Sequence, residues 1–291
     1  MHLSPALRQR LGRARLIAAG AVATSGVGER RSNQRGEGIE FEEHRPYQPG
    51  DDARRIDPNL YARHGSAYVR EYNVGRQLTV TLLLDASRSM AFGSPSKLEA
   101  LHGLASGLAT VALASSDAIQ VGVWQAGRLS WHERRSGLTR LDDMEHSWAK
   151  LRGEGNSDIA AAVRQARDQL PPRGYTVLVS DLWSDHTGAA IDALAAAQQS
   201  LLIVQLLSPE EVHPERYTGG AVRMVDAETS DEVEVTLGPA QIDRYRRLLG
   251  EWTDDVRQRV LAVGGRFVRV ISDDSADEVF MRRLPRLGVL R

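Results

Sequence analysis

The stretch LTVTLLLDASRS at residues 78–89 changes abruptly from apolar to polar. Its first part is rich in leucine, valine and threonine, which is typical of a strand buried on both faces of a sheet. Asp85 ends the apolar run, and Ser87 and Ser89 follow it at alternate positions. The sequence therefore places a carboxylate and two hydroxyl groups at the point where a buried strand ends.

The rest of the chain alternates between strand-like and helix-like patterns. Ser96 opens a capping-box pattern, and leucines follow it at helical spacing. Further strands are predicted at 119–124, 128–133, 175–180, 201–207 and 266–272, and further helices at 139–151, 158–169, 187–199 and from Ile242 to Val256. This alternation predicts an α/β fold with a doubly wound, mostly parallel sheet. The strand at 128–133 is reached by a hairpin, so we expect it to form an antiparallel edge.

We expect two parts in the chain. Residues 1–76 would hold an amphipathic helix, an Arg- and Gly-rich loop at 25–38, and a segment of short β-like pieces. Residues 77–288 would form the α/β domain, with a β-hairpin near 221–237. Because the 38–76 segment and this hairpin are both β-like and have no place in the central sheet, we expect them to form a small β subdomain together.

The composition excludes several classes of function. The 291 residues carry a net charge of −1 and no cysteine, which excludes disulfides and thiolate chemistry and favours a reducing, cytoplasmic location. The start of the chain lacks the apolar core of a signal peptide, and no apolar run is long enough to predict a membrane span. Asp85 stands where a dinucleotide-binding fold would need glycine, so no nucleotide is expected.

Carboxylates and hydroxyls are predicted to meet at one edge of the sheet. Asp181 follows the strand at 175–180, and ligands of open α/β sheets bind at the carboxyl ends of strands where the strand order reverses. The loop at 153–158 precedes a helix and can bring Ser157 to the same edge. Hard oxygen donors of this kind predict a divalent cation, Mg²⁺ or else Mn²⁺ or Ca²⁺. The expected ligands are Asp85, Ser87, Ser89, Ser157 and Asp181.

The segment Asp85-Ala-Ser87-Arg-Ser89 resembles the Asp-x-Ser-x-Ser motif of von Willebrand factor A domains. The metal-ion-dependent adhesion site of that family adds a threonine from a second loop and an aspartate from a third. The resemblance implies that Ser157 stands in for the threonine, with Asn156 and Asp158 as alternatives, and that Asp181 is the aspartate. It also implies a site that accepts a carboxylate from a partner protein.

A second resemblance covers the segment before this motif. Residues 38–41 (GIEF), 45–57 (RPYQPGDDARRID), 62–63 (AR) and 69–71 (VRE) are similar to the signature of the bacterial domain-of-unknown-function family number 58. Members place this signature before a von Willebrand A domain, and this chain resembles their shorter, soluble form. The resemblance implies a MoxR-type AAA+ ATPase as partner. One departure is Pro58, where the family usually has tryptophan.

The signature segment has two interpretations. In the first, its charges pair locally and clamp a Pro-Gly turn to the domain; in the second, they bind the partner. The candidate partner-binding residues are Arg45, Tyr47, Asp51, Asp52, Arg54, Arg55 and Asp57.

Three functions compete. The first is a non-enzymatic, metal-dependent adaptor of the ATPase that helps to assemble or mature other proteins. The second is a metal-dependent hydrolase that uses the same carboxylates, with Asp185 or His186 as base. The third is nucleic-acid binding through the first 35 residues, which carry seven arginines and one glutamate but no aromatic side chain to stack on bases. We favour the adaptor.

Overall fold

The computed structural model describes residues 1–17, 40–47, 51, 56–73, 78–217, 221–225 and 232–291. The chain divides into two compact units, Met1–Ala19 with Leu78–Arg291 and, separately, Gly20–Gln77. The N-terminal helix therefore groups with the larger unit. No helix in the described ranges is both long and apolar enough to span a bilayer.

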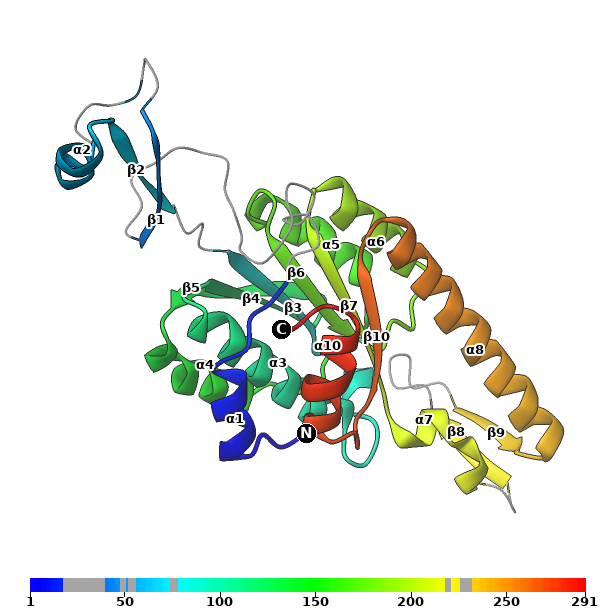
Figure 1. Cartoon of the computed structure of the whole chain (residues 1–291). Helices are drawn as coiled ribbons and strands as arrows, with labels where there is room; N and C mark the ends of the chain where they lie inside the picture. The colour runs from blue at the N-terminus through cyan, green and yellow to red at the C-terminus, as the bar shows by residue number, and fades with distance from the viewer. Residues whose placement is uncertain (18–39, 48–50, 52–55, 74–77, 218–220, 226–231) are drawn as a thin grey trace. The chain divides into compact units, whose positions relative to one another are not determined.

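A six-stranded sheet in the order β10-β7-β6-β3-β4-β5 forms the centre of the larger unit (Figure 1). The strands are β3 (Thr79–Asp85), β4 (Ala118–Gln125), β5 (Arg128–Ser136), β6 (Tyr175–Ser180), β7 (Ser200–Leu207) and β10 (Arg266–Ile271). All neighbours run parallel except β4 and β5, which form an antiparallel hairpin at the edge. The predicted doubly wound sheet and its antiparallel edge strand are both confirmed.

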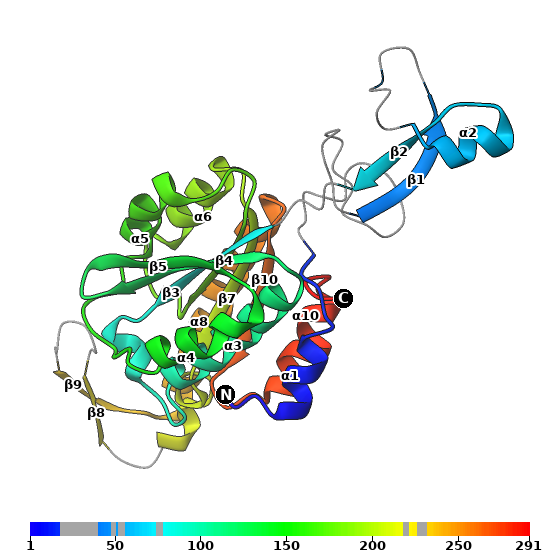
Figure 2. The same ribbon diagram turned by 90° about the vertical axis from the view of Figure 1, so that its left-hand side faces the viewer.

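Helices cover both faces of this sheet, as Figure 2 shows. One face packs against α1 (Pro5–Leu11), α3 (Lys97–Ala114), α4 (Leu141–Trp148) and the C-terminal segment of α9 (Ala276–Glu278), η6 (Val279–Arg283) and α10 (Leu284–Arg286). The other face packs against α5 (Ile159–Ala166), α6 (Thr187–Ala196) and α8 (Pro239–Ala262). Within β3, Leu82 and Leu84 join the first core and Leu83 joins the second, because successive side chains of a strand alternate between faces.

The small residues of α3 allow close packing by other segments as well as by the sheet. The ring of Phe280 lies where a Cβ atom of Gly107 would stand, and Met1 lies against Gly103 in the same way. The leucines of α1 are buried in the same core, as their helical spacing predicts. The two ends of the chain therefore dock on one helix, α3, which also begins at the carboxyl edge of the sheet.

Short elements complete the larger unit. They are η2 (Arg88–Ala91), η3 (Leu138–Arg140), η4 (Arg167–Gln169), α7 (Pro209–Val212), η5 (Pro214–Tyr217), β8 (Ala221–Val225) and β9 (Glu232–Thr236). The strands β8 and β9 pair antiparallel, which confirms the hairpin predicted near 221–237.

The smaller unit holds β1 (Glu40–Pro46), α2 (Pro58–His64) and β2 (Tyr68–Asn73). The strands β1 and β2 pair antiparallel in a sheet of their own, and β8 and β9 form another. Among the described strands, the two segments do not share the sheet that a common β subdomain would need, because each pair forms a two-stranded sheet of its own.

Pro58, the departure from the family signature, begins α2. The carboxylate of Asp57, just before it, is buried and accepts a hydrogen bond of 3.3 Å from the Leu60 N–H. Proline is favoured at the first position of a helix, where its missing N–H would have no intrahelical partner. Asp57 therefore serves the local structure as a helix cap.

Candidate functional site

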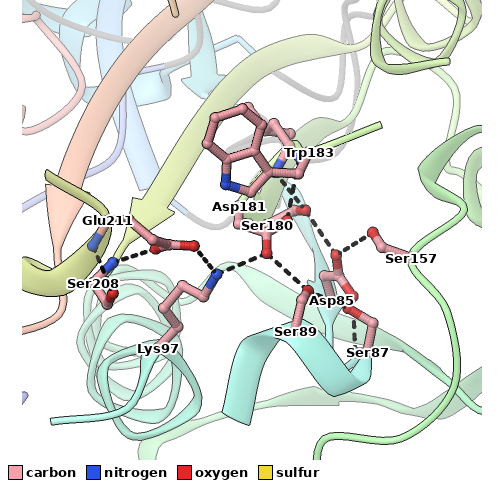
Figure 3. Close-up of polar contacts among 11 residues, drawn as sticks. Asp85, Ser87, Ser89, Lys97, Ser157, Ser180, Asp181, Trp183, Ser208 and Glu211 are labelled. Carbon is pink, nitrogen blue, oxygen red and sulfur yellow. Dashed lines mark hydrogen bonds and ion pairs between the residues drawn. The ribbon is translucent and has the colours of Figure 1, made fainter. Parts of the chain in front are cut away.

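The carboxyl ends of β3 and β6 meet at the point where the strand order reverses. From β3 the chain proceeds to β4 on one side of it, and the later strand β6 pairs on the other side. Asp85 ends β3 and Asp181 follows β6, so both carboxylates lie at this edge (Figure 3). Asp85 is 2% exposed and Asp181 is fully buried.

Asp85 is the centre of a hydrogen-bond network. Its Oδ1 accepts a bond of 2.9 Å from the Ser87 N–H, and its Oδ2 accepts bonds from the hydroxyls of Ser157 at 2.8 Å and Ser180 at 2.7 Å. Burial raises the pKa of Asp85, the nearby charge of Asp181 raises it further, and the bonds from Ser180 and Ser87 oppose this shift. The carboxylate is thus held in place by donors although ionising it here is unfavourable.

Asp181 is held by a second set of donors. Its Oδ2 accepts hydrogen bonds of 2.8 Å from both the Ser89 hydroxyl and the Lys97 ammonium, and its Oδ1 accepts a longer bond of 3.3 Å from the Trp183 N–H. The hydroxyl oxygens of Ser87 and Ser89 lie 3.2 Å apart. The five residues chosen from the sequence are therefore gathered in one cluster (Figure 3).

The loop before α5 brings Ser157, rather than its neighbours, to Asp85. The Asn156 carbonyl accepts a bond of 3.0 Å from the Trp124 indole N–H, and the Asp158 carboxylate caps α5 by accepting from the Ala161 N–H at 2.8 Å. Backbone bonds from the Arg88 N–H to the Gly155 carbonyl and from the Glu154 N–H to the Ala86 carbonyl tie this loop to the turn after β3. These hydrogen bonds, on both sides of Ser157 in the chain, fix its position next to Asp85.

Three further residues belong to the cluster and were not predicted from the sequence: Ser180, Lys97 and Glu211. Lys97 is only 1% exposed, and its Nζ lies 2.8 Å from Asp181 Oδ2 and 2.7 Å from Glu211 Oε1. Burial lowers the pKa of Lys97, but the charges of Asp181 and Glu211 outweigh burial and leave this pKa above its ordinary value. Lys97 follows the capping Ser96, a position where a lysine side chain is usually exposed to water. The local sequence pattern therefore did not predict that Lys97 is buried.

The cluster fits a small divalent cation. Serine hydroxyls can donate to carboxylates and still offer lone pairs to a metal. Adjacent oxygen ligands of an octahedral Mg²⁺ ion, with bonds of about 2.1 Å, lie about 3.0 Å apart, close to the separation of the Ser87 and Ser89 oxygens. The described residues contain no group of three or more His, Asp or Glu side chains able to hold a metal. A cation here would therefore depend on hydroxyls and water as well as on carboxylates.

An apolar groove borders this cluster. Its volume is about 650 Å³, and its lining is Trp183, Ser184, Asp185, His186, Tyr245, Leu248, Leu249 and Trp252. The rings of Trp183 and Trp252 stack with centroids 6.4 Å apart, while 39% of Trp183 and 51% of Leu248 remain exposed. Burial raises the pKa of Tyr245 to about 12, with a further contribution from Glu211. The groove is thus linked to the cluster through Trp183 and Glu211.

Among the described residues, those predicted as hydrolase bases or as partner-binding residues are not part of the cluster. Asp185 and His186, the bases of the hydrolase hypothesis, line the groove. Tyr47 is partly exposed, Asp51 is half-buried, and Arg45 lies on β1. Asp52, Arg54 and Arg55 lie outside the described residues, so their partner-binding role stays a prediction.

The arginines of α1 take part in ion pairs. Arg8 lies 2.7 Å from Glu145, and Arg10 lies 3.2 Å from Asp277. Both pairs are partly or largely exposed, so each contributes little to stability, although the two help to orient α1. The arginines from Arg30 to Arg35 lie outside the described residues.

A doubly wound sheet with carboxylates and hydroxyls at its switch point defines an α/β domain of the von Willebrand A type. The model of the family described as "Protein of unknown function DUF58" matches residues 43–251. That match covers well over half of the chain, and the chain belongs to this family.

Relatives are found in mycobacteria. The chain is 28% identical over 247 residues to "Uncharacterized protein Rv1480" of Mycobacterium tuberculosis, a match that covers 82% of this chain and 76% of that protein. "Uncharacterized protein Mb1516" of Mycobacterium bovis matches to the same extent.

Solved structures show more distant likeness. The conserved hypothetical protein BatB from Bacteroides thetaiotaomicron matches with a TM-score of 0.47 and 17% identity, over 72% of this chain and 98% of that one. The SpRpn10 VWA domain matches with a TM-score of 0.42 and 9% identity, over 72% and 96%. The fold assignment rests on the strand order of Figure 1 rather than on these similarities.

Proposed function

We propose that this protein is a non-enzymatic interaction module whose switch-point cluster holds a divalent cation, Mg²⁺ or else Mn²⁺ or Ca²⁺, to which a partner protein adds a carboxylate. The observation that carries the proposal is the convergence of three loops. The hydroxyls of Ser89 and Ser157 donate to the buried carboxylates of Asp181 and Asp85, and the Ser87 oxygen lies 3.2 Å from that of Ser89. A bound cation would supply a positive centre for an incoming oxygen ligand.

Each residue of the cluster has a distinct part in this proposal. Ser87, Ser89 and Ser157 would offer hydroxyl oxygens to the cation. Asp85 and Asp181 orient these hydroxyls by accepting their hydrogens, and their negative charge favours a cation. The backbone bonds that tie the loop of Gly155 to the turn of Arg88 keep the oxygen atoms at a fixed spacing.

The partner that we propose is a MoxR-type AAA+ ATPase, with this chain acting as its cytoplasmic adaptor in the assembly or maturation of other proteins. Support for a protein partner comes from the groove beside the cluster, where Trp183 and Leu248 stay exposed. Aromatic side chains are enriched in protein interfaces, especially in their centres. Trp183 links the groove to the cluster, because it lines the groove and its backbone N–H donates a hydrogen bond to Asp181.

Binding of the purified full chain to the ATPase tests this function. In Mg²⁺ we expect binding that EDTA abolishes and that Ser89→Ala weakens by about tenfold or more, because the variant removes one ligand and one donor to Asp181. Ser130→Ala, on the exposed side of edge strand β5, is the matched control and should bind as the wild type does. Binding that persists in EDTA and in Ser89→Ala would contradict the proposal.

The hydrolase hypothesis uses the same cluster. Its bases, Asp185 and His186, line the neighbouring groove, and among the described contacts neither side chain is hydrogen-bonded to Asp85 or Asp181. Phosphatase or nuclease turnover that Asp181→Ala abolishes would establish this function in place of the adaptor.

A further inference from the structure

The cluster already contains a cation, the ammonium group of Lys97. Figure 3 shows Lys97 reaching from α3 between Asp181 and Glu211, with Nζ at 2.8 and 2.7 Å from one oxygen of each carboxylate. The side chain has almost no contact with water. This triad of two carboxylates and one buried ammonium ties Asp181 to a residue outside the motif.

We propose that Lys97 is an internal counter-ion that sets how tightly the cluster holds a divalent cation, and that Glu211 in turn fixes the position of Lys97. This inference rests on the proposed function, because it concerns the same cation. Lys97 does not itself provide an oxygen ligand, so it is a positioning residue.

The geometry gives Lys97 two effects on a cation. Its Nζ donates to the same atom of Asp181, Oδ2, that accepts the Ser89 hydroxyl, so it neutralises part of the negative charge that would favour a cation. Its positive charge also lies next to any divalent ion in the cluster, and like charges repel strongly where water is excluded. Both effects weaken metal binding relative to a cluster without Lys97.

Glu211 should strengthen cation binding, whereas Lys97 should weaken it. Two hydrogen bonds to Ser208 hold Glu211 in place. Its Oε2 accepts a bond of 2.6 Å from the Ser208 N–H, while the Ser208 hydroxyl accepts from the Glu211 N–H at 3.2 Å. This capping box at the start of α7 leaves Oε1 directed at Lys97. The negative charge of Glu211 offsets the ammonium, and with Asp85 and Asp181 ionised the four groups sum to −2, the charge that one divalent cation neutralises.

A purely structural ion pair would behave differently. Losing one partner of a buried ion pair destabilises a fold whichever partner is removed. A counter-ion of a metal site predicts opposite effects on metal affinity instead. Removing the positive charge of Lys97 should tighten metal binding, and removing the negative charge of Glu211 should weaken it.

Calorimetric titration of the purified full chain with Mn²⁺ tests the inference. We expect Lys97→Met to bind Mn²⁺ about tenfold or more tightly than the wild type, and Glu211→Gln to bind it about tenfold more weakly. Equal affinities in the wild type, Lys97→Met and Glu211→Gln would overturn the inference.

Thermal unfolding in EDTA and in Mn²⁺ controls for folding. Lys97→Met should unfold at a lower temperature than the wild type in EDTA, because it leaves the buried Asp181 and the partly buried Glu211 without a cation. Mn²⁺ should raise the midpoint of the variant more than it raises that of the wild type. If Lys97→Met does not fold even in Mn²⁺, the affinity of Glu211→Gln decides: a weaker affinity supports the inference and an unchanged one overturns it.

The outcomes also separate this inference from the proposed function. Mn²⁺ binding that is equal in all variants contradicts the role of Lys97 alone and leaves the metal-dependent adaptor standing. If neither the wild type nor any variant binds Mn²⁺, the inference and the metal site of the proposed function both fail.

Discussion

At the scale of single residues, Asp85 combines a buried charge with a dense set of donors. Burial and the neighbouring Asp181 raise its pKa, whereas three hydrogen bonds hold its oxygens in place. An acid whose pKa is higher in the folded than in the unfolded state opposes folding once the unfolded chain ionises. A carboxyl group whose pKa is raised by burial and by a second carboxylate is a candidate functional group.

Asp85→Asn should therefore separate stability from metal binding. The amide has the same shape without the charge, so in EDTA at neutral pH we expect a free energy of unfolding equal to that of the wild type or higher by about 1 kcal/mol. Mn²⁺ should stabilise the wild type but not the variant. Thermal or urea unfolding, with and without Mn²⁺, measures both effects.

The pH dependence has a definite sign. Below the unfolded pKa of about 4 both proteins are uncharged at this position, and as the pH rises through the raised folded pKa the metal-free wild type should lose stability relative to Asp85→Asn. A wild type that gains stability relative to the variant over this range in EDTA would show that Asp85 is stabilised as a carboxylate by its donors.

At the scale of secondary-structure elements, α3 and α8 use glycine differently. Gly107 of α3 faces the ring of Phe280 with no room for a Cβ atom, whereas Gly250 of α8 faces open space. The first glycine allows the C-terminal segment to dock, and the second has no packing role.

Alanine substitution should therefore give opposite results at these two glycines. We expect Gly107→Ala to lower the free energy of unfolding by about 1–3 kcal/mol through overpacking. Gly250→Ala should raise it by up to about 1 kcal/mol, since alanine is the better helix former. Urea unfolding of the two variants compares them, and a neutral Gly107→Ala would contradict the close packing of Phe280 on α3.

Two leucines of α8 allow a test of whether the partner protein covers the groove. Leu248 lines it and is 51% exposed, while Leu261 of the same helix is 53% exposed and is not among the residues that line the groove. If the partner covers the groove, Leu248→Glu should weaken ATPase binding by about tenfold or more, because a charge would be buried at the interface. Leu261→Glu is the matched control and should bind normally. Equal binding by both variants would place the partner elsewhere.

At the scale of the whole molecule, the sequence predicted those features that depend on local sequence pattern and on the topology of parallel sheets. The hairpin into β5 and the polar ends of β3 and β6 follow from short stretches of sequence, and the switch point then brings Asp85 and Asp181 together. The motif and the preceding signature also identified the family before the fold was known.

Contacts between distant elements were not predictable in the same way. Lys97 and Glu211 are separated by 114 positions, and their contact depends on how the segment after β7 folds back over the start of α3. Ser180 is the last residue of a buried strand, so its pattern alone could not show that its hydroxyl faces Asp85. The pairing of β1 with β2 was not predicted, because the sequence of a β-like segment does not show which segment it pairs with.

The central claim is that one divalent cation binds among these loops, and a crystal structure of the full chain with saturating Mn²⁺ tests it most directly. We predict an anomalous-scattering peak bound by the Ser87, Ser89 and Ser157 oxygens at about 2.2 Å, with both aspartates beside it. A map of crystals grown in saturating Mn²⁺ that shows no peak at this cluster would contradict the account.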